Sequence, residues 1–451
     1  MRVLLVSPHF PPAHVGGVEY YAQRLAAWLD SKGCEPAVVC VERVTAAEKR
    51  VVHAEVDDHY GYPVYRLDVG VKPGAHGFRL HWQHPALEEW IGTLLSRARP
   101  DILHLHSGYL LGDATLAAAR AGHVPTIVTL HDLWFLCPRM TMMHPDMSRC
   151  SGPDDGAKCA WCLLTEQRRF RLPDRWTSGA IGRVAKLALR TWPVRNRTSW
   201  GELASAVTRR QRGALEALAS AQAILSPSRF VRTQLERAGF EPGRIRIVPY
   251  GIGPCRPPRR ERPKNPGVLR IGYLGQLAPH KGVHVLIAAA RSLRSSAFEL
   301  RLAGPTDAHV EYMRTLRQMA ASDPRIRFTG AYDNDHVGDL LARLDVVIVP
   351  SVWHENWPFV VLEAFRAGAP VIASGVGGLT EMIRHDVDGL LFDPGSHVDL
   401  AHCLQRLLDD PLLLPRLRNG IQPVRSDEDE QADLLDIYAR AAESSQGAHS
   451  V

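Results

Sequence analysis

One structural plan occurs twice in this chain, and it limits the fold more than any other feature. The plan is a short apolar run, a loop that contains glycine, and a stretch with apolar residues at helical spacing. The first copy begins with RVLLVSP at residue 2 and continues into AHVGGVEYYAQRLAAWLDSKG, where Gly33 ends the helical pattern. The second copy runs from VLRIGYLG at residue 268 through QLAPHKG into VHVLIAAARSL. The chain therefore starts a strand-to-helix unit of a parallel sheet twice.

Further short apolar runs alternate with helical patterns along both halves. They are AVVCV, DILHLH, TIVTL, AILSPS and IRIVPYG in the first half, and LRLAG, IRFTG, DVVIVPS and PVIAS in the second. Strands that alternate with helices predict parallel sheets with crossover helices. We therefore expect an α/β protein with two Rossmann-like doubly wound domains that face each other across a cleft.

Composition indicates where the domains meet. The stretch GIGPCRPPRRERPKNPG contains five Pro and three Gly, which is typical of a linker. We predict an N-terminal domain over 1–250 with an insert at about 137–212, a linker over 251–267, and a C-terminal domain over 268–425. Residues 426–451 are expected to form a final helix and a tail.

The overall composition is that of an ordinary globular protein. The 451 residues are 45% hydrophobic and 23% charged, which excludes the disordered and fibrous classes. The N-terminus has only four consecutive apolar residues, Val3 to Val6, too few for a signal peptide. No run approaches the roughly 18 apolar residues that span a bilayer. The expected location is cytoplasmic.

Two carboxylates stand eight residues apart in the segment HENWPFVVLEAF. Glu355 falls in the loop after the predicted strand DVVIVPS, and Glu363 falls inside a short helix that Pro358 begins and Gly368 ends. Because the neighbours of Glu363 are apolar, its charge needs a partner. That partner is either Arg366 on the same helix or a pair of ligand hydroxyls, such as those of a ribose.

Loops after other predicted strands carry further candidate site residues. Gly16 and Gly17 allow a ligand to approach the backbone at a helix start that attracts phosphate, although two glycines here are also common for geometric reasons alone. Lys281 beside the second helix start either neutralises a diphosphate or is a solvated surface lysine. His131 after TIVTL is either a site residue or an ordinary capping or core residue.

The segment HENWPFVVLEAF resembles the E-x7-E motif of the retaining glycosyltransferases of family 4, which have the GT-B fold. The resemblance extends, in the expected order, over GGVE, TLHD, SPS, VPYG, GQLAPHKG, VPS and GVGGLTEMI. It implies an enzyme of class EC 2.4 that moves a sugar from a nucleotide-sugar donor to a hydroxyl of a glycan, lipid-linked glycan or small molecule, as in polysaccharide biosynthesis. It also implies that catalysis retains the anomeric configuration and requires no metal or other cofactor.

The resemblance also implies roles for individual residues. Glu363 would bind the ribose of the donor, Lys281 its diphosphate, and Glu355 its sugar. His131 would lie near the donor sugar on the acceptor side, so that the implied catalytic residues are Glu355, His131 and Lys281. The remaining implied donor-binding residues are Gly16, Gly17, Gln276, Asn356, Trp357, Pro358 and Phe359.

Gln276 departs from the family pattern, because family members commonly carry Arg at this position. Glutamine keeps a hydrogen-bonding group but removes one positive charge that would face the leaving diphosphate. A non-catalytic nucleotide-sugar-binding subunit is therefore one alternative function. A GT-B nucleotide-sugar 2-epimerase is the other, because it shares the architecture.

Four cysteines cluster within 26 residues. Cys159 and Cys162 form a C-x2-C pair with metal-ligand spacing, and Cys137 and Cys150 precede them in the same insert. We expect either a structural zinc site, with His144 as a spare ligand, or free or redox-active thiols, or a disulfide. The absence of a secretory signal argues against a disulfide framework.

Residues 166–212 contain twelve Lys or Arg against three Asp or Glu. Within them Ile181, Val184, Ala185 and Ala188 form an apolar stripe with basic residues beside it, and Trp176, Trp192 and Trp200 lie nearby. This pattern predicts either peripheral contact with an anionic membrane, at its inner face, or a basic helix packed on its own domain. No nucleic-acid-binding motif accompanies the charge, so nucleic acid is not an expected partner.

Overall fold

The computed structural model describes residues 1–12, 16–46, 52–58, 60–71, 83–153, 155–191, 197–253, 267–333 and 336–448. The chain divides into two compact units, Met1–Val248 with Gln431–Val451, and Pro249–Glu430. Three predicted features lie outside the described residues, namely Trp192, positions 254–266 of the expected linker, and the last three residues of the tail.

The first unit is a doubly wound α/β layer. Its strands are β1 (Arg2–Val6), β2 (Glu35–Ala46), β3 (Val52–Asp57), β4 (Val64–Val71), β5 (Ile102–His106), β6 (Thr126–Thr129), β7 (Ala223–Ser226) and β8 (Ile245–Ile247). Its helices are α1 (Gly17–Ser31), α3 (Pro85–Ala98), α4 (Gly112–Ala121), α5 (Gly156–Leu164), α6 (Arg168–Trp176), α7 (Ala180–Arg190), α9 (Ser199–Ala219) and α10 (Arg229–Arg237).

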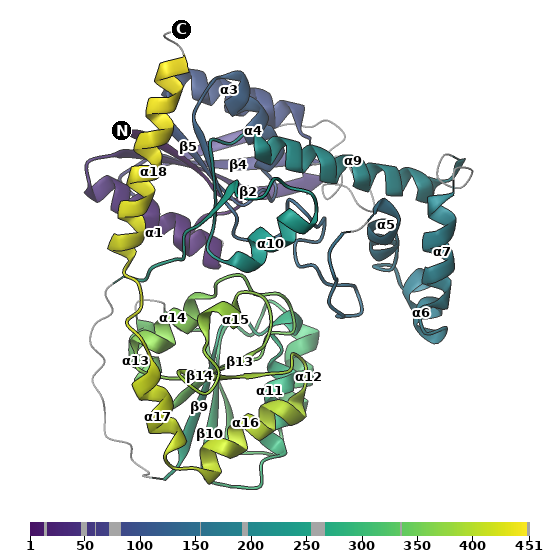
Figure 1. Ribbon diagram of the computed structural model, residues 1–451, viewed down its shortest axis with the longest axis vertical. Coiled ribbons are helices and arrows are strands. Elements are labelled where there is room, and N and C mark those ends of the chain that lie inside the picture. The colour runs from purple at the N-terminus through teal and green to yellow at the C-terminus, as the bar shows by residue number, and fades with distance from the viewer. Residues whose placement is uncertain are drawn as a thin grey trace. The chain divides into compact units, whose positions relative to one another are not determined.

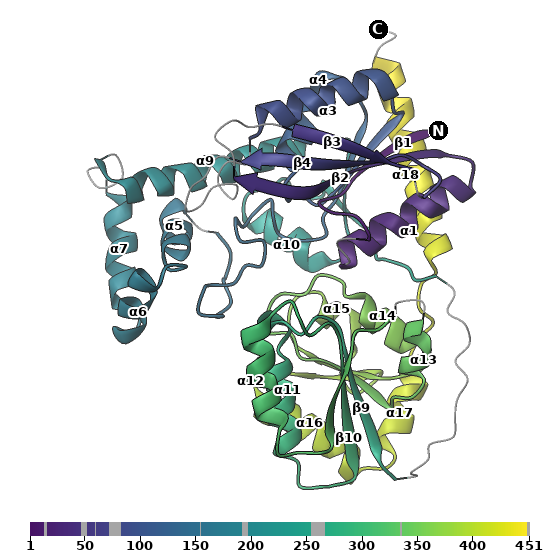
Figure 2. The same cartoon turned by 180° about the vertical axis from the view of Figure 1, so that it is seen from behind.

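These strands form one sheet in the order β3-β4-β2-β1-β5-β6-β7-β8. All neighbours are parallel except β3, which pairs antiparallel with β4 at the edge. Helices α3 and α4 lie on one face of the sheet and α1 lies on the other (Figure 2). Because helices cover both faces, the central strands β5 and β6 are buried along their whole length.

Helices α5, α6 and α7 form an insert that stands away from the sheet, beside one end of α9 (Figures 1 and 2). The insert has an apolar core of its own, in which Trp161 of α5 packs with Leu189 of α7 and Leu203 of α9. Asp174 of α6 accepts hydrogen bonds from the Trp161 indole (3.2 Å) and the Gly182 amide (2.7 Å). These bonds join the three helices of the insert to one another.

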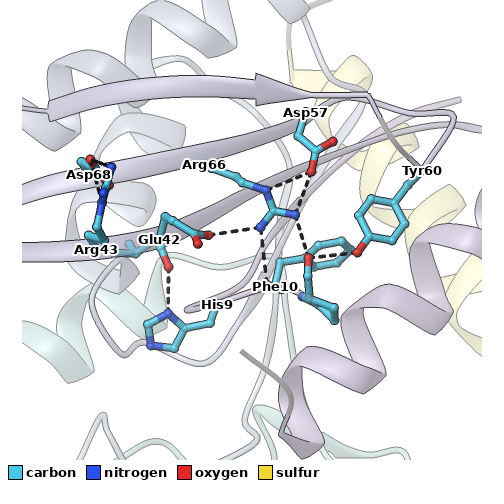
Figure 3. A network of polar contacts seen from close by, with 10 residues as sticks. His9, Phe10, Glu42, Arg43, Asp57, Tyr60, Arg66 and Asp68 are labelled. Atoms are coloured by element: carbon cyan, nitrogen blue, oxygen red, sulfur yellow. Dashed lines mark hydrogen bonds and ion pairs between the residues drawn. The ribbon is translucent and has the colours of Figure 1, made fainter. Parts of the chain in front are cut away.

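Arg66 of β4 ties the loop after β1 to the edge of the sheet (Figure 3). Its guanidinium lies 2.9 Å from the Asp57 carboxylate of β3 and 3.2 Å from the Glu42 carboxylate of β2. It also donates to the Pro11 carbonyl oxygen at 2.7 Å, and the Tyr60 hydroxyl donates to the same oxygen at 3.0 Å. This network fixes the start of the loop that leads to α1.

The second unit is also a doubly wound α/β layer. Its strands are β9 (Leu269–Leu274), β10 (Phe298–Ala303), β11 (Ile326–Gly330), β12 (Val346–Val349), β13 (Val371–Ser374) and β14 (Gly389–Phe392). Its helices are η1 (Pro279–Lys281), α11 (Val283–Arg291), α12 (Val310–Ala320), α13 (Val337–Leu341), α14 (Phe359–Arg366), α15 (Leu379–Met382), α16 (His397–Asp409) and α17 (Leu413–Gly420).

The second sheet has the order β11-β10-β9-β12-β13-β14, and its strands are parallel. Helices α11, α12 and α16 pack on one face, and α13 and α14 pack on the other (Figure 1). The strand order reverses between β9 and β12, which is where open sheets of this type bind ligands.

The predicted α/β class with two doubly wound layers is confirmed, since both sheets are built from the expected apolar runs and are parallel apart from the edge strand β3. The sequence patterns do not predict β3, β4 or β14. The final helix, α18 (Asp427–Ala448), buries Leu434, Ile437 and Tyr438, and from Gln431 on it belongs to the first unit. None of the described helices is both long and apolar enough to cross a membrane.

Candidate functional site

In the second unit, Lys281 and Glu355 form a buried ion pair. The Lys281 ammonium lies 2.8 Å from Glu355 Oε1 and 4.8 Å from the centroid of the Trp353 ring. The Ser351 hydroxyl donates to the same carboxylate oxygen at 2.6 Å. Glu355 is only 5% exposed. The sequence predicts both charged residues as site residues, but it predicts neither their pairing nor the contribution of Ser351.

The backbone brings this pair to the carboxyl ends of the adjacent strands β9 and β12. Gly282, at the start of α11, has a φ of +71°, and a Cβ atom there would lie 1.9 Å from the Pro350 carbonyl oxygen. The Val352 amide donates to the His280 carbonyl oxygen at 3.0 Å. Because Gly282 lets the start of α11 lie against the loop after β12, Lys281 is held next to Glu355.

The loop after β13 supports Glu355 as well. Gly377 has a φ of +59°, and a Cβ atom there would lie 2.3 Å from the Glu355 carbonyl oxygen. The Gly378 amide donates to that oxygen at 2.8 Å. Loops after three neighbouring strands, β9, β12 and β13, therefore meet at Glu355.

Charge balance keeps Glu355 ionised in spite of its burial. Burial opposes ionisation, but the Lys281 charge and the hydrogen bonds from Lys281 and Ser351 outweigh it and lower the pKa of Glu355 below its usual value. Burial, followed by the Lys281 charge, lowers the pKa of His280 to about 4. At neutral pH the site thus combines a carboxylate and an ammonium with a neutral imidazole next to Lys281.

The segment after Glu355 leads directly into α14. Pro358 is the N-cap residue, one position before the helix, and the Phe359 ring stacks on Tyr250 with centroids 5.3 Å apart. Asn356 and Trp357 are half-buried. The Trp357 indole nitrogen is buried and has no hydrogen-bond partner among the described residues. A buried donor of this kind suits a bound ligand that carries an acceptor.

Glu363 lies less deep than its apolar neighbours suggest. Helix α14 buries Val361 and Ala364, which share one face, and Glu363 lies outside that face and is half-buried. Glu363 and Arg366, both described, form no ion pair, and Arg366 Nη1 is buried without a hydrogen-bond partner. Of the two partners considered for Glu363, Arg366 is therefore not the one that the structure gives it.

Gln276, the position that departs from the family pattern, is exposed in the loop after β9. Its backbone carbonyl oxygen accepts a hydrogen bond from the Tyr273 hydroxyl at 2.6 Å. That bond fixes the loop, while the amide side chain stays accessible.

In the first unit, two imidazoles join the ends of β5 and β6. His106 Nδ1 lies 3.1 Å from His131 Nε2, and the Tyr21 ring of α1 packs against both imidazoles. Burial, followed by His106, lowers the pKa of His131 well below its usual value, and burial lowers the pKa of His106 to about 3. Both rings are therefore neutral at pH 7. The sequence predicts His131 but not its partner.

A second histidine of β5 connects this region to the last helix. His104 Nδ1 lies 2.6 Å from the Tyr438 hydroxyl of α18, and His104 Nε2 lies 2.7 Å from the Thr129 hydroxyl of β6. Burial, followed by the neighbouring His106 and His131, lowers the pKa of His104 well below its usual value. Helix α18 is thus hydrogen-bonded to the strands that carry His106 and lead to His131.

Gly16 and Gly17, at the start of α1, have no packing role that would require glycine. Gly16 is the N-cap residue with an extended φ of −135°, and a Cβ atom there would meet only the carboxylate of the flexible Glu19 side chain. Around Gly17 nothing lies within 4 Å of such an atom. Steric demands within the described protein therefore do not explain why glycine stands at these positions.

The four clustered cysteines do come together in the structure. Cys137, Cys150, Cys159 and Cys162 line one cavity of about 20 Å³, and His144 lines it too. All four are free thiols. In the part of the chain that the structure describes, no group of three or more His, Cys, Asp or Glu side chains is arranged so that it could hold a metal ion. The four thiols thus lie around one cavity, but they do not form a closed coordination sphere.

Comparison with known proteins identifies the architecture. Over 97% of this chain and 98% of the other, the structure matches sucrose-phosphate synthase from Thermosynechococcus elongatus with a TM-score of 0.64 and 19% identity. It matches the Anabaena protein HepE, solved in complex with UDP, with a TM-score of 0.64 and 16% identity over 98% and 100% of the two chains. The fold is therefore that of the GT-B glycosyltransferases.

Sequence comparison gives the family. Residues 15–178 match the model described as "Glycosyltransferase Family 4", and residues 269–410 match "Glycosyl transferases group 1". Glycogen synthase of Mycobacterium tuberculosis is 26% identical over 453 residues, which cover 96% of this chain and 92% of that protein. The chain belongs to the group 1 glycosyltransferases of family 4 and is a glycosyltransferase of class EC 2.4.

Proposed function

We propose that this protein is a retaining glycosyltransferase that takes its sugar from a nucleotide-sugar. The Lys281–Glu355 pair carries the proposal, because it lies at the carboxyl ends of β9 and β12, next to the starts of α11 and α14. Parallel sheets bind ligands at this edge, and helix starts attract phosphate groups. The UDP in the HepE complex supports a nucleoside diphosphate as part of the donor.

The charges of the site match those that develop during glycosyl transfer. Cleavage of the bond between sugar and diphosphate builds negative charge on the phosphate and positive charge on the sugar ring. Lys281 and the backbone amides at the start of α11 would stabilise the phosphate. Glu355 would stabilise the ring, and the free Trp357 N–H would donate to a donor oxygen. No metal is needed for this charge balance.

The remaining donor contacts follow the family resemblance. Glu363, half-buried on α14, is assigned to the ribose. The backbone of 356–359 is assigned to the donor sugar and phosphates. Packing does not require glycine at positions 16 and 17, and we assign Gly16 and Gly17 to the diphosphate. The neutral His131 is assigned to the donor sugar on the acceptor side.

Retention is best explained by attack on the front face of the sugar. A double displacement needs a carboxylate nucleophile that is free to attack the anomeric carbon. Glu355 is held by Lys281 and Ser351 and is therefore poorly placed for that role. On the front face, the leaving phosphate itself accepts the proton of the acceptor hydroxyl.

A panel of UDP-, GDP-, ADP- and TDP-sugars tests this proposal. One donor should raise the thermal midpoint of the protein, since a ligand that binds only the folded state stabilises it. With that donor, the protein should slowly release free sugar or transfer the sugar to an acceptor, and EDTA should not change the rate. The variants Lys281→Met and Glu355→Gln should lose this activity. Appearance of a new sugar epimer without acceptor would instead identify a 2-epimerase. Binding without any turnover would identify a non-catalytic subunit.

We further propose that the acceptor is lipid-linked and is met at the inner face of an anionic membrane in the cytoplasm. The outer surface of α6 and α7 exposes large apolar side chains, with Trp176 at 78%, Val184 at 68% and Leu187 at 65%. Arg175, Arg183 and Arg190 are exposed on the same two helices. Apolar side chains flanked by cations are typical of helices that lie in a charged lipid interface.

Co-sedimentation with vesicles tests the membrane contact. The protein should bind vesicles that contain phosphatidylserine and not vesicles of phosphatidylcholine alone, and Val184→Ser with Leu187→Ser should weaken binding. Val310→Ser is the matched control, because Val310 of α12 is equally exposed at 67% but lies outside this surface. Equal binding by the control and the double variant would contradict the assignment.

A further inference from the structure

The four gathered cysteines come from two separate parts of the insert region. Cys137 and Cys150 flank a small hairpin in the loop after β6, in which Met143 pairs antiparallel with Arg149. Cys159 and Cys162 lie one turn apart on α5. All four line a cavity of about 20 Å³, large enough for a single small ion. Nothing in the glycosyl-transfer site uses these side chains.

Cationic side chains surround the thiols. The side chains of Arg139 and Lys158 line the cavity. Arg210 of α9 is fully buried nearby, where its charge acts on both Cys137 and Cys159. Three cations around four thiols would balance the negative charge of a metal bound by thiolates.

A thiol that coordinates a metal ion is deprotonated outright. In the described structure no three of these side chains are placed to hold an ion, so coordination requires the cysteine side chains or the segments that carry them to move.

We propose that Cys137, Cys150, Cys159 and Cys162 bind one structural zinc ion. Four thiolates select zinc among abundant divalent ions, and a closed four-sulfur set leaves no position for substrate. The ion would fasten the hairpin at 142–150 to α5, the first helix of the protruding insert. His144 lines the cavity but is not needed as a ligand when all four sulfurs coordinate.

Elemental analysis of the full-length protein, purified under reducing conditions, tests the proposal. We expect one zinc per chain in the wild type, and loss of zinc in Cys159→Ser and in Cys162→Ser. His144→Ala and Cys34→Ser are matched controls that should keep the metal, since His144 is a cavity neighbour and Cys34 is a half-buried thiol outside the cluster. Far-UV circular dichroism checks that the variants remain folded.

Cobalt gives a second measurement that does not depend on stable variants. Co²⁺ added to protein stripped of metal should produce the charge-transfer and d–d absorption of a tetrahedral four-thiolate site, and Zn²⁺ should abolish these bands. Iron with labile sulfide, a disulfide within the cluster found by mass spectrometry, or zinc loss in His144→Ala would each overturn the proposal. So would the absence of metal both after purification and after reconstitution with Zn²⁺.

Discussion

Removal of Lys281 should destabilise the second unit by about 3 kcal/mol at pH 7. The ammonium and the Glu355 carboxylate lie 2.8 Å apart, and at an effective dielectric constant of about 20 two unit charges at that distance attract by about 6 kcal/mol. Much of this attraction offsets the cost of burying the two groups, and loss of one partner from a buried pair costs about 3–5 kcal/mol. Because the Lys281 side chain is 23% exposed, we take the lower end of that range.

The effect should depend on pH in a defined direction. In the wild type the pKa of Glu355 is lowered from its ordinary value of 4.5, so its charge contributes stability that is present above about pH 4.5 and is lost as the pH falls through the folded-state pKa. In Lys281→Met, burial acts without its main opposing charge, and the pKa of Glu355 should rise above 4.5. The variant should therefore differ most from the wild type at neutral pH, and the difference should shrink toward pH 4.5.

Two buried cysteines can report on the two units separately. Cys40 of β2 belongs to the first unit and Cys403 of α16 to the second. Each protein is labelled with a thiol reagent along a temperature ramp, and mass spectrometry shows which cysteine has reacted. The labelling midpoint of Cys403 should be about 6–12 °C lower in Lys281→Met than in the wild type, because a loss of 1 kcal/mol lowers the midpoint of a domain of this size by about 2–4 °C. The labelling midpoint of Cys40 should stay where it is in the wild type.

A surface pair provides the control. Arg314 and Glu311 are 2.7 Å apart but exposed, so Arg314→Met should cost less than about 1 kcal/mol. Glu355→Gln in the Lys281→Met background should recover part of the lost stability, because it removes the uncompensated charge. Equal shifts for Lys281→Met and Arg314→Met, or a further loss in the double variant, would refute the reasoning.

Three other predictions use the same assay. Gly377→Ala should destabilise the second unit by about 1–3 kcal/mol through strain at positive φ and the clash with the Glu355 carbonyl, whereas Gly330→Ala, also at positive φ but with open space, should cost less. Tyr438→Phe should cost the first unit about 1–3 kcal/mol, because it leaves His104 Nδ1 buried without its partner; an unchanged Cys40 midpoint would contradict this. The labelling midpoint temperature of Cys40 should also decrease as the pH is lowered below about 6.5, because the three histidines bind protons in the unfolded chain but stay neutral in the folded protein. Each histidine would lower the free energy of unfolding by up to about 1.4 kcal/mol per pH unit. A midpoint that stays constant down to about pH 5.5 would argue against neutral rings.

The core of the fold could be predicted because its strands and helices follow from local patterns of apolar residues. Every apolar run that the sequence offers as a strand is one, since buried parallel strands need continuous apolar residues. β3 escapes this rule because it lies at the sheet edge and carries polar side chains, and β4, the next strand, is only partly buried. Arg66 of β4 forms ion pairs with Asp57 and Glu42, which lie on other strands, and a local sequence pattern does not predict such pairs.

The site was predictable as a set of positions but not as a set of contacts. Lys281 and Glu355 stand out because they follow strands in recognisable loops, yet their pairing spans 74 residues of sequence. The link between His104 and Tyr438 spans 334. His104 and His106 did leave a signal, since two imidazoles within the buried run DILHLH need polar partners inside the protein.

The two units treat buried polar groups differently around their candidate site residues, and the difference bears on the proposed reaction. In the first unit His104, His106 and His131 are neutral, whereas in the second unit the charge of Lys281 is paired with that of Glu355. A donor diphosphate that draws the Lys281 ammonium toward its own oxygens would leave Glu355 with the Ser351 hydroxyl as its remaining described partner. The carboxylate would then be least compensated when positive charge develops on the sugar ring, so one lysine would couple stabilisation of the leaving group to stabilisation of the ring. Because Gln276 supplies no charge, this coupling would rest on Lys281.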